Sequence, residues 1–376
     1  MNVLVVAARG NPEAGGGFTF VEAIVTAVTA YEESHPGHHF LFYPPRAEEA
    51  PPRRGLFRRK KTDLETVIAR DAIDLVWFVN PTSIPVSAPY IATVWDLAHR
   101  THPLFPEVST AGWKWEEREA AARATLPRAT RIVTGTEEGR NEIVTCYGVY
   151  QGNVRVVPMP IDLGDTGSLE TIDVRGKYAL TRPYLFYPAQ FWPHKNHVNL
   201  ILALDLLVRQ HGLDLDLVLT GSDKGNGDHV MATVKGLALD NRVRHLGFVP
   251  KADLYGLYRE AFCLAFASFF GPDNIPPLEA FALSCPVVAA RAPGTAEQLG
   301  DAAQLFDPAD PSDIARQVLA VWSDPSLRTE LIARGAKVVA DRGVNRYIAQ
   351  IGRIIDELAA LRRNWGRIYV DQTKRR

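Results

Sequence analysis

The sequence predicts an α/β protein built from two doubly wound parallel-sheet domains. Short, continuously apolar runs alternate with segments of helical spacing, which is typical of parallel strands covered by helices on both faces. The same alternation starts again after a polar, turn-rich stretch at residues 163–182. With 376 residues, the chain is long enough for two domains that each have a core.

The first half contains six expected strands and one clear helix. The first apolar run, residues 3–7, ends at the turn signal Arg9-Gly10-Asn11-Pro12, and helical spacing follows at residues 18–31. The other expected strands lie at residues 39–42, 73–78, 91–94, 131–133 and 154–157.

The second half repeats this pattern. Strands are expected at residues 184–187, 216–219, 243–246, 263–267, 286–289 and 304–306, and helices at residues 197–210, 251–259, 277–283, 311–322, 325–341 and 344–363. We therefore expect a first domain at residues 1–165 and a second at residues 166–345. A C-terminal helix within residues 346–376 is expected to pack back on the first domain.

The composition excludes several classes of protein. The net charge of −1 gives no reason to expect a nucleic-acid partner. Three widely spaced cysteines form neither a zinc pattern nor a disulfide framework, which favours a reducing cytoplasm. No run approaches about 18 apolar residues, and residues 1–8 resemble a buried strand more than a signal peptide, so we expect no membrane span and no leader.

Glycines cluster between the first expected strand and its helix. Gly16 and Gly17 would let the backbone approach a ligand, and the helix start offers free N–H groups to an anion. The spacing is neither the dinucleotide fingerprint G-x-G-x-x-G nor a P-loop. We expect phosphate or sugar contact here, with a flexible turn as the alternative.

A second candidate loop follows the first strand of the second domain. It places Gln190 and Lys195 directly before an expected helix. A lysine there can neutralise a diphosphate, and the helix start adds N–H donors. The alternative is a solvated lysine, but the neighbouring rings of Phe191, Trp192 and His194 favour an ordered loop.

The most specific signal is the segment at residues 268–281, between an expected strand and a helix starting near Pro277. Proline suits the first helical position because its missing N–H has no helical partner there. Glu279 would lie in the first turn, where it could accept hydrogen bonds from a vicinal diol such as ribose. Its alternative role is to complement the helix dipole.

Together these loops resemble those of the retaining glycosyltransferases of GT-B fold (glycosyltransferase family 4-like, glycosyl transferases group 1), which include sucrose and glycogen synthases. Pro276, Leu278 and Glu279 match the family's glutamate-containing pattern. The resemblance covers nearly the whole second domain and is thinner in the first. It implies two Rossmann-like domains facing a central cleft, a ribose clamp at Glu279, and donor contacts from the backbone N–H groups of Asn274 and Ile275.

Two departures from the family pattern change the expected donor pocket. The pattern's first glutamate falls at Gly271, so Asp273 is the expected substitute and Asn274 the alternative. Lys195 matches the family's lysine, but Gln190 stands where arginine is usual.

Two further turns of the second domain resemble the family. Gly221 matches a glycine turn near the nucleotide, and Val249 lies in a segment whose backbone would meet the base.

In the first domain, residues 93–100 resemble the family's T-V-H-D-L segment, with Trp95 where histidine is common. In the family, a residue of this loop touches the donor sugar near the reacting carbon. We expect His99 to have that catalytic role, supported by Asp96, with both facing the cleft. The alternative is that Asp96 caps a helix and His99 lies at the surface.

The resemblance also implies a mechanism without a metal or other cofactor. A nucleotide-diphosphate sugar is the co-substrate, the configuration is retained, and the leaving diphosphate helps to deprotonate the acceptor. The sequence nearest to a D-x-D metal motif, Asp214-x-Asp216, lies at the entrance to an expected strand. We interpret it as polarity at a strand edge.

A basic run from Arg53 to Lys61 contains two apolar residues. It could dock on anionic lipid, which would suit a lipid-linked glycan acceptor and a peripheral position at the inner face of the membrane. A solvated surface loop is the alternative.

The leading hypothesis is a hexosyltransferase that passes a hexose from a nucleotide-diphosphate sugar, with GDP-mannose favoured, to a glycan or lipid-linked glycan in the cytoplasmic assembly of a polysaccharide. The alternatives are a sugar-nucleotide epimerase or hydrolase of the same fold and a non-catalytic nucleotide-sugar or glycan-binding protein. A nicotinamide oxidoreductase is weaker, because no G-x-G-x-x-G follows either first strand.

Overall fold

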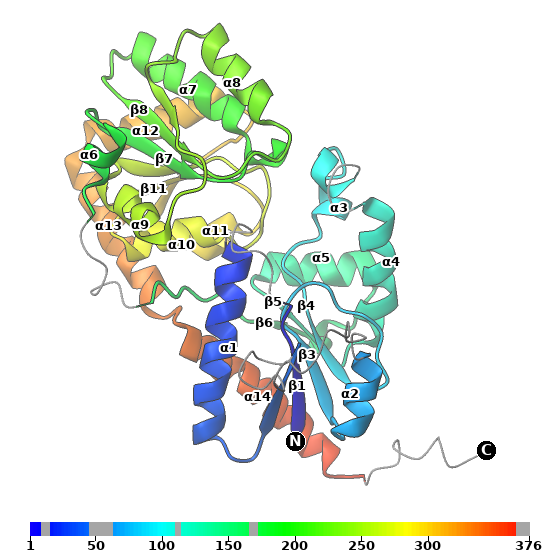
Figure 1. The fold of residues 1–376 in the computed structure, drawn as a ribbon. Helices are drawn as coiled ribbons and strands as arrows, with labels where there is room; N and C mark the ends of the chain where they lie inside the picture. The colour runs from blue at the N-terminus through cyan, green and yellow to red at the C-terminus, as the bar shows by residue number, and fades with distance from the viewer. Residues whose placement is uncertain (9–15, 45–62, 110–113, 165–171, 366–376) are drawn as a thin grey trace, which may run out of the picture.

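The computed structural model contains two six-stranded sheets, each flanked by helices (Figure 1). It describes residues 1–8, 16–44, 63–109, 114–164 and 172–365. Two doubly wound parallel sheets confirm the predicted fold class. The basic run at residues 53–61 lies outside the described residues. None of the helices in the described ranges is long and apolar enough to cross a membrane.

The first sheet has the strand order β2-β1-β3-β4-β5-β6, and all neighbouring strands run parallel. Its strands are β1 (Asn2–Val6), β2 (His39–Tyr43), β3 (Leu75–Phe78), β4 (Tyr90–Thr93), β5 (Arg131–Thr134) and β6 (Val154–Val156). The helices between them are α1 (Gly16–Ser34), α2 (Leu64–Arg70), α3 (Ala98–Thr101), α4 (Trp115–Thr125) and α5 (Glu137–Tyr147). Successive side chains of β1 enter different cores, Val3 and Val5 on one face and Leu4 on the other.

The second sheet has the order β12-β11-β10-β7-β8-β9 and is also parallel throughout. Its strands are β7 (Tyr184–Pro188), β8 (Asp216–Thr220), β9 (Val243–His245), β10 (Cys263–Phe266), β11 (Val287–Ala290) and β12 (Ala303–Phe306). Its helices are α6 (Val174–Tyr178), α7 (His197–Arg209), α8 (Gly227–Gly236), α9 (Lys251–Glu260), α10 (Ile275–Ala282), α11 (Thr295–Leu299), α12 (Pro311–Ser323) and α13 (Pro325–Ala340). Most central strand residues are fully buried, as expected for strands covered on both faces.

The last helix, α14 (Val344–Arg362), returns to the first domain and lies beside α1 (Figure 1). Its buried residues Ile348, Ile351 and Ile355 share one apolar core with Val3 and Val5 of β1. The chain therefore crosses between the domains twice.

The predicted start of helix α10 is wrong by two residues. The helix begins at Ile275, after Asn274 in extended conformation, and Pro276 and Pro277 both lie inside its first turn. This placement is tolerated because the first N–H groups of a helix have no intrahelical partner. Glu279 consequently lies in the second turn, so its expected place in the first turn is also wrong.

The strand orders locate the ligand-binding edge of each domain. In the first sheet the direction of strand addition changes between β1 and β3, and in the second between β7 and β10. Parallel α/β sheets bind ligands at such points, beyond the carboxyl ends of the strands. The loops after β7 and β10 lie at the second of these points, and the loop after β4 emerges at the carboxyl edge of the first sheet.

Candidate active site

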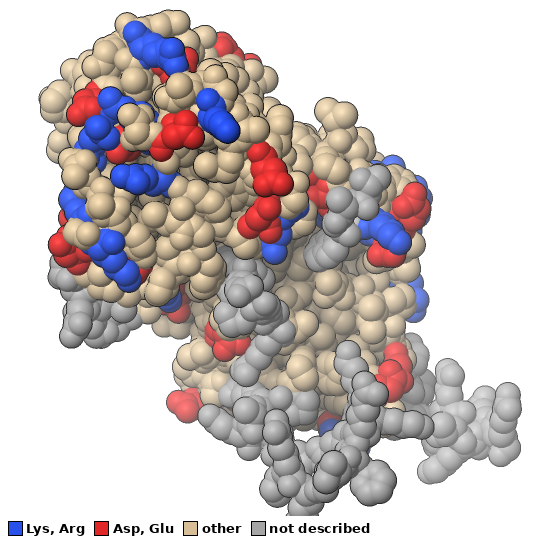
Figure 2. Space-filling view, turned by 45° about the horizontal axis from the view of Figure 1, so that its top comes forward, with Lys and Arg blue, Asp and Glu red and all other residues tan. Residues whose placement is uncertain are grey.

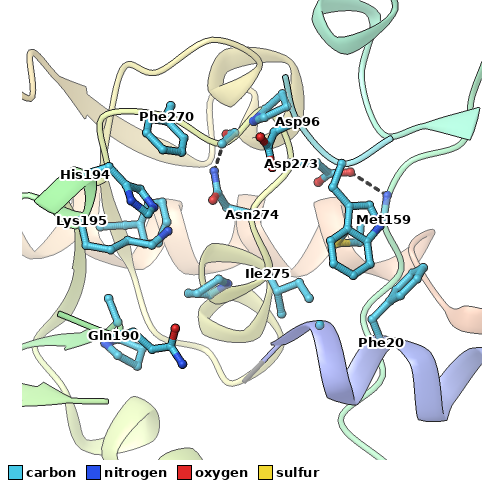
Figure 3. Close-up of a pocket in the computed structure, with 18 residues that line it drawn as sticks. Phe20, Asp96, Met159, Gln190, His194, Lys195, Phe270, Asp273, Asn274 and Ile275 are labelled. Atoms are coloured by element: carbon cyan, nitrogen blue, oxygen red, sulfur yellow. Dashed lines mark hydrogen bonds between the residues drawn. The ribbon is translucent and has the colours of Figure 1, made fainter. Parts of the chain in front are cut away.

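A cavity of about 340 Å³ lies between the two domains at these strand ends (Figure 3). The first domain contributes Gly17, Phe20, Trp95 and Asp96, and Met159 joins them after β6. The second domain contributes the loop after β7 and residues 270–276 after β10. The volume falls within the range of small-molecule sites in proteins.

Lys195 projects into this cavity from the loop after β7. Tyr187 donates a hydrogen bond from its hydroxyl to the Lys195 carbonyl at 2.7 Å, and Asn196 donates to the carbonyls of Ala267 and Pro308. These bonds fix the lysine backbone. The Nζ atom has a hydrogen bond to Ser268 Oγ at 3.4 Å and lies 5.6 Å from the Phe266 ring centroid.

Burial lowers the pKa of Lys195 to about 8, while the negative charges of Asp96 and Glu107 partly oppose that shift. No carboxylate within the described part of the chain forms an ion pair with Lys195. At neutral pH the cavity therefore holds a largely protonated ammonium in apolar surroundings, where an anionic ligand would be strongly attracted.

Gln190 also lines the cavity, on the same loop as Lys195 (Figure 3). Its Oε1 accepts a hydrogen bond from Trp192 Nε1 at 2.9 Å. Gly221 lies behind this loop with a φ of +128°, and a Cβ there would be 2.5 Å from the Ala189 carbonyl oxygen. Gly221 is thus needed for close packing of the loop and does not itself line the cavity.

Asp273 lines the cavity but is occupied by contacts that join the domains. It accepts a hydrogen bond from the Met159 backbone N–H at 2.8 Å and another from Gln298. Burial raises its pKa to about 6, while the Met159 hydrogen bond and the Arg342 charge act in the opposite direction. The expectation that Asp273 replaces the missing glutamate therefore competes with an evident structural role.

The backbone N–H groups of Asn274 and Ile275 differ in their hydrogen-bond partners. The Asn274 N–H donates to Gln298 Oε1 at 3.1 Å, so the expectation that it is open to a donor is wrong. Ile275 is the first residue of α10 and lines the cavity, and its N–H is of the kind that a helix leaves without an intrahelical partner. The Asn274 side chain donates to the Gly271 carbonyl at 2.5 Å.

Gly271 has a φ of +125°, a conformation that favours glycine. A glutamate could not replace it without a change in the loop backbone. The departure from the family pattern at this position is thus a different loop path as well as a missing carboxylate.

The first-domain wall contains Gly17, Trp95 and Asp96. A Cβ at Gly17 would be 3.4 Å from the Trp95 ring, so Trp95 packs closely over the start of α1. Asp96 accepts from the Ala98 N–H at 2.9 Å and from Arg118 at 2.8 Å. Burial alone would raise the pKa of Asp96, but Arg118 and the Ala98 N–H hold it below its usual value, so the carboxylate is ionised. Gly16 is the first residue of α1.

His99 does not face the interdomain cavity, contrary to our expectation. It is buried inside the first domain, with Nε2 3.1 Å from the Tyr147 hydroxyl and 3.3 Å from Glu119. His99 lines a separate cavity inside the first domain, which Asp96 and Arg118 also line. This position gives His99 a structural role in a polar network, and the surface position considered as its alternative is wrong too.

Glu279 and Val249 lie outside the main cavity. Glu279 borders a small recess that shares Phe20 and Ile275 with it, and accepts a hydrogen bond from the Tyr258 hydroxyl at 2.8 Å. Burial raises the pKa of Glu279, and the Tyr258 hydrogen bond opposes that shift. Val249 is buried.

The Asp214 and Asp216 carboxylates are paired with arginines. Arg182 lies 2.9 Å from Asp214 and 3.4 Å from Asp216, and Arg242 contacts both. The pair lies at the start of β8, at the opposite end of that strand from the cavity. No cluster of three metal-ligating side chains occurs in the portion of the chain that the structure describes.

Two residues that were not candidates for a functional role meet at the edge of the cavity. Glu107 of the first domain and His194 of the second form a buried interdomain pair. His194 stood out only as one ring of an aromatic loop, and Glu107 lies in no recognisable motif. Only the packing of one domain against the other brings them together.

Comparison with known proteins agrees with this arrangement. Residues 170–338 match the family Glycosyl transferases group 1. The O-antigen chain mannosyltransferase B of Escherichia coli is 28% identical over 220 residues, and the match spans 58% of this chain and 58% of that protein. The chain thus matches little more than half the length of this curated relative.

Solved structures show the same architecture. The sucrose-phosphate synthase of Thermosynechococcus elongatus superimposes with a TM-score of 0.73 at 17% identity, covering 96% of this chain and 99% of that one. The Anabaena protein Alr3699/HepE in complex with UDP-glucose gives a TM-score of 0.69 at 18% identity, covering 95% and 100%. At these identities the likeness establishes the fold, which is that of the GT-B glycosyltransferases. The second half of the chain, at residues 170–338, is thus similar in sequence to the Glycosyl transferases group 1 family.

The two roles considered for Asp273 predict different results for the Asp273→Ala variant without ligand. If the carboxylate joins the domains, its loss leaves the Met159 N–H without its acceptor, removes one of the two acceptors of Gln298 Nε2, and lowers the free energy of unfolding by about 1–3 kcal/mol. Urea unfolding measures this change, with Asp301→Ala, at an exposed loop position, as the control. Unchanged stability would show that Asp273 is not a structural contact.

Proposed function

We propose that the protein transfers a hexose from a nucleotide-diphosphate sugar to a hydroxyl group of a glycan or lipid-linked glycan, with retention of configuration. The observation that carries the proposal is the half-buried ammonium of Lys195 in a cavity where the strand ends of both domains meet. The family match and the UDP-glucose complex of the Anabaena protein support a nucleotide-sugar donor.

In the proposed reaction, the bond between the sugar C1 and the diphosphate oxygen breaks, and the acceptor oxygen bonds to C1. Negative charge grows on the leaving diphosphate, where Lys195 and the Ile275 N–H at the start of α10 would stabilise it. The acceptor proton passes to an oxygen of the leaving diphosphate. These groups supply the charge stabilisation without a metal ion.

The opposite wall is assigned to the sugar and the acceptor. Asp96 is ionised and held in place by Arg118, so it can accept hydrogen bonds from hydroxyl groups but is a weak base. We assign it a role in orienting the sugar or the acceptor. Glu279 lines the small recess beside the cavity, and we assign it the role of accepting hydrogen bonds from the ribose hydroxyl groups.

The donor sugar is proposed from the relatives. The similarity to an O-antigen chain mannosyltransferase of Escherichia coli points to a mannose donor, whereas the Anabaena complex contains UDP-glucose. We favour GDP-mannose or a similar hexose donor in polysaccharide assembly.

The unpaired, buried Cys263 and Cys285 suit a cytoplasmic location. On the face shown in Figure 2, acidic and basic residues are interspersed over the second domain, which suits a small-molecule partner better than nucleic acid.

A thermal-shift screen against UDP, GDP, ADP, CMP and dTDP tests the proposal, followed by turnover of the matching sugar donors. One nucleoside diphosphate is expected to raise the melting temperature, because only the folded protein binds it. The Glu279→Ala variant should lose most of that shift, since the ribose would lose its acceptor. If no nucleotide stabilises the wild-type protein, the transferase proposal fails and a glycan-binding protein becomes the better account.

Donor affinity should depend on pH through Lys195. The ammonium predominates below its pKa of about 8 and is lost above it, so affinity should fall about tenfold between pH 7 and pH 9. Calorimetric titration with the selected nucleoside diphosphate measures this change. Lys195→Arg keeps its charge and should show no such decline. A wild-type affinity that stays constant to pH 9.5 would mean that Lys195 does not bind the diphosphate.

A further inference from the structure

A loop of the first domain, residues 102–109, lies against the second domain beside the cavity; we name it the latch loop. The Phe105 ring contacts those of Phe269 and Phe270 at centroid distances of 5.4 and 5.5 Å. Val108 is buried in the same small apolar cluster. The latch loop therefore belongs to the interface that closes the two domains over the cavity.

Glu107 extends from the latch loop into the donor side of that interface. Its Oε1 accepts a hydrogen bond from the His194 backbone N–H at 2.8 Å, and it also pairs with His194 Nδ1. Both residues are less than 10% exposed. A carboxylate of one domain thus binds the residue immediately before Lys195 in the other.

The protonation states suit this pairing. Burial lowers the pKa of His194 to about 4, so the ring is neutral at pH 7 and Nδ1–H can donate to Glu107. Burial alone would raise the pKa of Glu107, but the two hydrogen bonds from His194 outweigh it, so Glu107 is a carboxylate. The Phe270 ring stacks on His194 at 4.1 Å and limits the orientation of the imidazole.

The remaining contacts of this loop come mostly from the second domain. Tyr187 and Asn196 hold the backbone on the far side of Lys195, and the Phe269 N–H donates to the His194 carbonyl at 2.9 Å. From the first domain, Glu107 binds the His194 N–H and ring, and the Phe105 ring lies 6.4 Å from the imidazole. The position of Lys195 thus depends in part on a carboxylate of the other domain.

We propose that Glu107 is a positioning residue: through His194 it fixes the loop that carries Lys195, so that closure of the domains completes the donor-phosphate site. This inference rests on the proposed function of that site. Binding and closure are then linked, because a diphosphate bound at Lys195 favours the closed arrangement that Glu107 stabilises.

Two substitutions separate the hydrogen bonds from simple loss of a side chain. Glu107→Ala leaves both His194 donors buried without an acceptor, and should weaken binding of UDP or GDP, whichever stabilises the wild-type protein, by about 10- to 100-fold. Glu107→Gln keeps an acceptor oxygen and should recover most of that loss. If the glutamine variant binds as poorly as the alanine variant, hydrogen bonding to His194 is not the cause.

A double-mutant cycle with Lys195→Ala tests whether Glu107 acts through the lysine. The two alanine substitutions should be strongly non-additive in nucleotide affinity, since a mispositioned loop has little effect once Lys195 is gone. Additive effects would contradict the proposal.

Glu297→Ala is the matched control. Glu297 also crosses the interface, where it accepts from the Glu137 N–H at 2.7 Å at the start of α5, but it does not touch the loop. Its effect should be small and additive with Lys195→Ala. If it reproduces the full effect and coupling of Glu107→Ala, loosening of the interface explains both variants and the proposal fails.

Amide hydrogen exchange of the ligand-free protein separates this inference from the proposed function. Glu107→Ala should speed exchange in peptides covering residues 193–197, and Glu297→Ala should not. Unchanged exchange would contradict the proposal that Glu107 fixes the loop carrying Lys195, even if nucleotides bind. Faster exchange in a protein that binds no nucleotide would confirm the contact and reject the donor site.

Discussion

The partial burial of Lys195 between two domains is the constraint on which the site depends. A lysine loses the solvation of its charge when buried, which lowers its pKa to about 8. Its direct contacts are a hydroxyl group and an aromatic face, and the nearest carboxylates act only at longer range. The negative charge of a diphosphate would offset this loss of solvation, and the Anabaena protein of the same fold has been solved with UDP-glucose.

The fold explains why this lysine can be placed there. Both sheets are parallel and doubly wound, so their ligand-binding loops emerge at one edge, and the two edges face each other. The chain crosses twice between the domains, and α14 is anchored in the first-domain core. Asp273, Glu107 and Glu297 then join the facing edges by hydrogen bonds. The cavity is thus built by both domains together.

The two sheets and the loops at their facing edges could be predicted from the sequence. Buried parallel strands have continuous apolar sequences, and the loops that follow them emerge at one edge of the sheet. On that basis Gln190, Lys195, Ile275 and Asp96 were predicted to lie at the cleft, and all of them line one cavity in the structure. The prediction failed where residues distant in the sequence determine the direction of a side chain or the partner of a hydrogen bond. The inward direction of His99 is set by Glu119 and Tyr147, and the Asn274 N–H is taken by Gln298. Glu107 and His194 pair only because the domains pack, and no periodicity or motif records that contact.

The most direct test of the central claim is a crystal structure of the protein with the nucleoside diphosphate that binds it. The account predicts phosphate oxygens within ion-pair distance of Lys195 Nζ, inside the cavity that Asp96 and Ile275 also line, with the ribose toward Glu279. A nucleotide bound elsewhere, or bound in this cavity with its phosphates away from Lys195, would contradict it.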